Sequence, residues 1–63
     1  MTLEKALDTV SVRKNELERV SIEALDEVID FTEREANRFP YDKFIREKVE
    51  AYKTIREYAR KEG

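Results

Sequence analysis

Residues 15–39 carry an apolar stripe of helical period that covers more than half of the helix circumference. At about 100° per residue, one side gathers the following side chains: Val20, Ala24, Leu25, Val28, Ile29, Phe31, Thr32, Ala36 and Phe39. One neighbouring helix covers a stripe of only roughly 100°. We therefore expect this long helix to be covered on two sides.

The start of the long helix has two readings. Asn15 followed by Glu18 approximates a capping box, which predicts a helix over about 15–38. Ser21 offers a second N-cap six residues later. The end is clearer, because Pro40 disfavours the α conformation at Phe39 and so predicts a last helical residue near Arg38.

A second long helix is expected over about 41–61, with Asp42 near its N-terminus. Its apolar side is formed by Tyr41, Phe44, Ile45, Val49, Tyr52, Ile55, Tyr58 and Ala59. The short connection at Pro40 predicts an antiparallel helical hairpin. Lys48 lies within the apolar stripe, where it either extends its amine to solvent or pairs with a carboxylate across an interface.

A short N-terminal helix is expected over about 2–12. Leu3, Ala6, Leu7 and Val10 repeat at helical spacing, and Thr2 is available as an N-cap. Thr9–Arg13 instead alternates polar and β-branched residues, so a strand there stays open.

The size of the chain favours self-association. A chain of 63 residues buries only about 60% of its unfolded surface, and this one has neither Cys nor His to supply disulfides or the usual structural zinc sites. We therefore predict one small all-α domain over 1–63 that forms a dimeric helical bundle. The lack of cysteine fits a cytoplasmic location.

Charge is distributed unevenly between the two long helices. Residues 15–39 contain eight acids and three bases, whereas residues 40–63 contain five acids and seven bases. Opposite signs across the hairpin favour the antiparallel pairing, although exposed ion pairs contribute only about 0–1 kcal/mol each.

Catalysis and cofactor binding are not expected. No His is present as a base, the only serines are Ser11 and Ser21, and the single glycine, Gly63, leaves no phosphate-binding loop. One helix carries a row of carboxylates: Glu23, Asp26, Glu27, Asp30 and Glu33. The favoured interpretation of this row is a solvated face, and the less favoured ones are a cation site or a docking strip for a basic partner. No metal and no cofactor are predicted. No membrane span is predicted either, since no apolar run approaches about 20 residues.

The preferred function is a non-catalytic interaction or regulatory module that binds a macromolecule. Aromatic side chains dominate such contacts, and the expected interface residues are Tyr41, Phe44, Tyr52, Ile55 and Tyr58. An overall pI near 5.2 disfavours a broad nucleic-acid binder.

The alternative is a DNA-binding regulator. The segment 18–23, followed about 20 residues later by 44–52, resembles the layout of ribbon-helix-helix repressors. The resemblance implies a dimer in which Arg19, Ser21 and Glu23 of a short strand face the major groove. It departs from the family in its acidic Glu23 and in its proline-containing turn. Thr9–Arg13 is a second candidate ribbon.

Overall fold

The computed structural model describes residues 1–62, and within that range every regular element is a helix. The elements are α1 (Leu3–Val10), the 3-10 helix η1 (Lys14–Arg19), α2 (Ile22–Arg38) and α3 (Lys43–Glu62). The all-α prediction is confirmed. No described residue is in a strand, so neither 9–13 nor 18–23 pairs as one.

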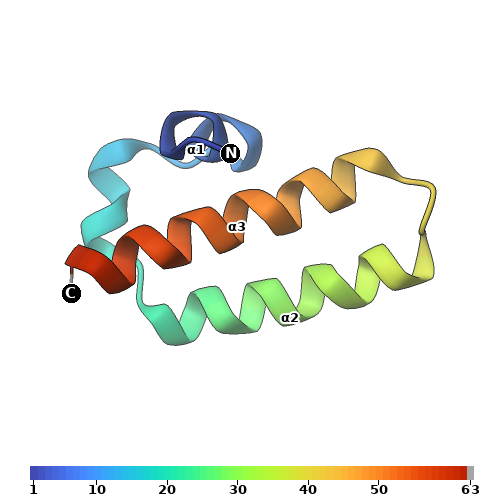
Figure 1. Ribbon diagram of the computed structural model, residues 1–63. Helices are drawn as coiled ribbons and strands as arrows, with labels where there is room; N and C mark the ends of the chain where they lie inside the picture. The colour runs from blue at the N-terminus through green and yellow to red at the C-terminus, as the bar shows by residue number, and fades with distance from the viewer. Residues whose placement is uncertain (63) are drawn as a thin grey trace.

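The central element of the fold is α3. Figure 1 shows α2 and α3 side by side and running in opposite directions, with α1 lying across the other side of α3. Both extensive contacts between the described helices involve α3, which packs against α1 and against α2. The broad apolar side of α2 is therefore covered within the chain by only one helix.

The long helix predicted over 15–38 is divided in the structure, so the start at Asn15 is wrong. Val20 and Ser21 are extended, and α2 begins at Ile22, where the Ser21 Oγ accepts a hydrogen bond from the Ala24 N–H at 3.0 Å. The reason is tertiary packing. The break allows Leu17 and Val20 both to pack against the core as the chain crosses from α1 to α2.

The N-terminal helix is shorter than predicted. Thr2 caps it as expected, since its Oγ1 accepts from the Lys5 N–H at 3.2 Å, but the helix ends at Val10 rather than near residue 12. Ser11 takes the left-handed conformation (φ 57°, ψ 39°), and the Val12 N–H bonds back to the Leu7 carbonyl at 3.0 Å. This is the usual geometry of a helix that ends on a left-handed residue.

Ser11→Gly is expected to raise the free energy of unfolding by about 0.5–1 kcal/mol. A residue with a Cβ is strained in the left-handed region, whereas glycine is not. Urea denaturation measures the change. Ser11→Ala is the matched control, because it also removes the hydroxyl but keeps the Cβ, and it should give no gain. Equal effects of the two substitutions would contradict the strain argument.

The core lies where α1 and α2 meet α3. Its buried side chains are Ala6, Leu7, Leu25, Ile29, Thr32, Ile45, Ala51 and Ile55. The one hydroxyl among them, that of Thr32, donates to the Val28 carbonyl at 2.6 Å, so no uncompensated polar atom is buried there.

The connection between α2 and α3 spans residues 39–42. Asp42 closes it by accepting two hydrogen bonds on Oδ1, from the Phe44 N–H at 2.9 Å and the Ile45 N–H at 3.2 Å. These bonds satisfy N–H groups that a helix N-terminus otherwise leaves unpaired, and they start α3 at Lys43, two residues later than predicted.

Candidate interaction surface

Four of the six aromatic side chains are exposed. They are Phe31 (63%), Phe39 (52%), Tyr41 (96%) and Phe44 (57%), and together we call them the aromatic surface. Phenylalanine is usually buried, and exposed apolar clusters in small proteins mark interaction sites. The aromatic surface is therefore the first candidate for a functional site in this chain.

The position of α1 explains why Phe44 is exposed. Ala51 lies seven residues after Phe44, so both occupy the same side of α3. Ala51 is fully buried in the cluster that includes Ala6 and Leu7 of α1. Thus α1 covers this side of α3 at Ala51 and leaves it open nearer the turn, at Phe44.

The edge of α2 that carries Phe31 is open for a similar reason. Phe31 lies about 130° from the centre of the buried row of Leu25, Ile29 and Thr32, on the side away from Asp26 and Glu33. Among residues 1–62, the one extensive helix contact of α2 is with α3, so no second helix covers Phe31, which is 63% exposed.

Two ion pairs join α2 and α3 along the edge of their contact that is opposite Phe31. Arg56 Nη1 lies 2.9 Å from Asp26 Oδ1, and Lys53 Nζ lies 3.3 Å from Glu33 Oε1. The unequal charges of the two helices predicted such pairs. They are partly exposed, so they set the register of the two helices more than they stabilise the fold.

The aromatic surface carries one half-buried charge from each long helix. Lys48 Nζ lies 5.2 Å from the centroid of the Phe44 ring, a cation–π distance. Glu35 lies one turn after Phe31 on α2 and is also half-buried. Among the side chains of residues 1–61, neither Lys48 nor Glu35 takes part in an ion pair.

The predicted interface residues fall in three different places. Tyr41 and Phe44 belong to the aromatic surface. Tyr52 is half-buried against the core, and Ile55, at 1% exposure, is inside it. Tyr58 lies near the other end of α3. Phe31 and Phe39 were missed because the apolar stripe predicted that both would be covered.

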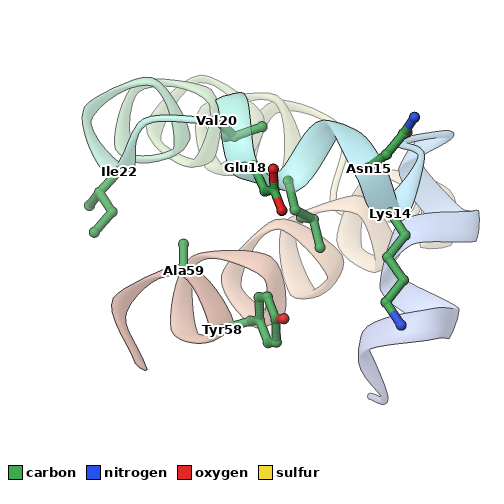
Figure 2. A pocket seen from close by; sticks show the side chains of 8 residues that line it. Lys14, Asn15, Glu18, Val20, Ile22, Tyr58 and Ala59 are labelled. Atoms are coloured by element: carbon green, nitrogen blue, oxygen red, sulfur yellow. The ribbon is translucent and has the colours of Figure 1, made fainter. Parts of the chain in front are cut away.

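A concave hollow of about 820 Å³ lies between the η1 region and the C-terminal part of α3. In Figure 2, Glu18 and Val20 lie across from Tyr58 and Ala59 of α3. Leu17 and Ile22 add to the apolar lining, and Lys14 and Asn15 lie at its edge. Its charged and amide side chains, those of Lys14, Asn15 and Glu18, are exposed, and nothing in their arrangement selects a ligand.

The residues that the alternative function assigns to DNA do not share a strand face. Arg19 ends η1 and is exposed, whereas the Ser21 hydroxyl caps α2. Paired ribbons present alternate side chains on one face, and the described chain contains no strand.

Some carboxylates of the row on α2 form ion pairs within the chain. Asp26 and Glu33 pair with bases of α3, and Asp30 pairs with Arg34 at 3.0 Å. Within residues 1–62, no group of three or more acidic side chains is placed to hold a metal ion.

Two further results bear on what the chain is. None of the helices in residues 1–62 is both long enough and apolar enough to cross a membrane. The chain matches no protein-family model, and neither the curated proteins nor the solved structures give a significant match.

Proposed function

We propose that this chain is a small non-catalytic interaction module that self-associates and acts by binding a macromolecular partner. The observation that carries the proposal is the aromatic surface, in which three phenylalanines and a tyrosine are more than half exposed. Aromatic rings supply a large contact area at low cost in side-chain entropy, which suits them to binding.

The proposed state is a homodimeric helical bundle built from hairpins that turn at Pro40. Two observations support it. Among the described helices, α2 has its one extensive contact with α3, and Phe31 on its broad apolar side is exposed. The core is also small: among the side chains of residues 1–61, Ile55 is the only large one below 2% exposure. Association would bury further apolar surface, which is the main favourable term available to a domain of this size.

Sedimentation equilibrium across micromolar concentrations tests the proposal. We expect a mass near 15 kDa, twice the 7.5 kDa of one chain, together with a melting temperature that rises with protein concentration. A mass of 7.5 kDa at every concentration, with a constant melting temperature, would refute self-association.

A further inference from the structure

We infer that the aromatic surface binds a second copy of this chain, with α2 of each copy lying over α3 of the other. This rests on the proposed function and names the face through which the two copies associate. The Glu33–Lys53 ion pair marks one edge of the α2–α3 contact. At about 100° per residue, Phe31 and Glu35 of α2 and Phe44 and Lys48 of α3 are turned roughly 140–180° away from these two residues, so the four lie along the opposite edge, on one face.

The two helices that flank this face carry opposite net charge. α2 contains six acidic and two basic residues, and α3 contains four acidic and seven basic residues. A strongly acidic partner would be repelled by α2, and a strongly basic one by α3. Asp26, Asp30 and Glu33 of α2 already pair with bases of the same chain. The complementarity on this face therefore comes from Glu35 of α2 and Lys48 of α3: a second copy offers its Lys48 to the first and its Glu35 to the second.

The half-buried charges lie at nearly the same level along the hairpin. Glu35 is three residues before the end of α2 at Arg38, and Lys48 is five residues after the start of α3 at Lys43. At a rise of about 1.5 Å per residue, they lie roughly 4.5 and 7.5 Å from the turn. The difference along the helix axis, about 3 Å, is within the reach of a lysine side chain.

A two-fold axis parallel to the helix pair brings Glu35 of one copy opposite Lys48 of the other. Such an axis keeps each residue's position along the hairpin and exchanges α2 with α3 across the interface. Glu35 of each copy then meets Lys48 of the other, which gives two equivalent ion pairs. Phe31, Phe39 and Phe44 lie around these pairs and exclude water from them, so the pairs are stronger than exposed ones.

The test is a charge exchange between two single variants, Glu35→Lys and Lys48→Glu. Each variant alone places like charges against each other twice across the interface, and its homodimer is expected to weaken by about tenfold or more. An equimolar mixture of the two restores both opposite-charge contacts, so it should form a heterodimer of about wild-type strength. Sedimentation velocity measures the association, and native mass spectrometry distinguishes the heterodimer by its mass.

The mixture separates contacts between chains from contacts within one chain. A Glu35–Lys48 interaction inside each chain stays broken in both variants after mixing, and it gives no heterodimer preference. Glu57→Lys is the matched control, because it makes the same charge change at an exposed position of α3 more than two turns from Lys48, and it should leave association unchanged. Far-ultraviolet circular dichroism verifies that each variant is as helical as the wild type.

The results distinguish this inference from the proposed function. A wild-type dimer together with a heterodimer preference supports both. A wild-type dimer whose strength none of the variants changes overturns the inference and leaves self-association standing on another face. A wild-type chain that is monomeric at every concentration overturns both.

Discussion

Replacing Ile55 with alanine is expected to lower the free energy of unfolding by about 2–5 kcal/mol. Ile55 is 1% exposed and lies in the cluster that contains Ala6 and Leu7 of α1 and Leu25 of α2. Its removal leaves a cavity where all three helices meet. For a domain of this size the total free energy of unfolding is about 3–9 kcal/mol, so much of it would be lost.

Urea denaturation at a fixed protein concentration measures this effect. Glu57→Ala is the control: it truncates an exposed side chain two residues further along α3 and should change the free energy of unfolding by no more than about 0.5 kcal/mol. A loss below about 1 kcal/mol for Ile55→Ala would mean that the three helices do not meet at this side chain.

Ile55 also shows how far the sequence predicts this fold. Helical periodicity was sufficient to predict an all-helical chain, because it depends on the spacing of apolar residues along one segment. The end of α2 at Arg38 followed from Pro40 alone. Periodicity places Ile55 on the apolar side of its helix, but it does not distinguish a core position from an interface position. That distinction depends on which helix covers the side chain.

The start of α2 needed information that the local sequence does not contain. Asn15 and Ser21 are both good N-caps, and the choice between them depends on packing. A helix continuous from residue 15 would remove the extended residues Val20 and Ser21, which redirect the chain between η1 and α2. Local preference was overridden by the path that the chain takes around the end of α3.

The aromatic surface was predicted only in part for a similar reason. Tyr41 and Phe44 were expected at an interface, but Phe31 and Phe39 were expected to be covered along with the rest of the long stripe. The sequence does not show that α1 packs on α3 rather than on α2. That docking choice leaves Phe31 exposed, and it depends on small residues where α1 crosses α3.

Ala51→Leu is expected to separate α1 from α3 and to cost about 1–3 kcal/mol of unfolding free energy. Ala51 and Ala6 are both fully buried, and their small side chains allow the two helices to approach closely. The added branched side chain has no space to enter. Because α2 also packs extensively on α3, and Ile29 and Ile45 are buried outside the cluster that holds Ala51, the α2–α3 pair should persist.

Hydrogen exchange followed by NMR measures this separation residue by residue. Amides of α1 should exchange much faster in Ala51→Leu than in the wild type, while those in the middle of α2 should change less, because local opening now exposes α1 alone. Ala24→Leu is the matched control, since it makes the same substitution at an exposed position of α2, and it should leave α1 protected. Equal acceleration in α1 and α2 would contradict the prediction, because it would mean that the α2–α3 pair has no stability of its own once α1 is displaced.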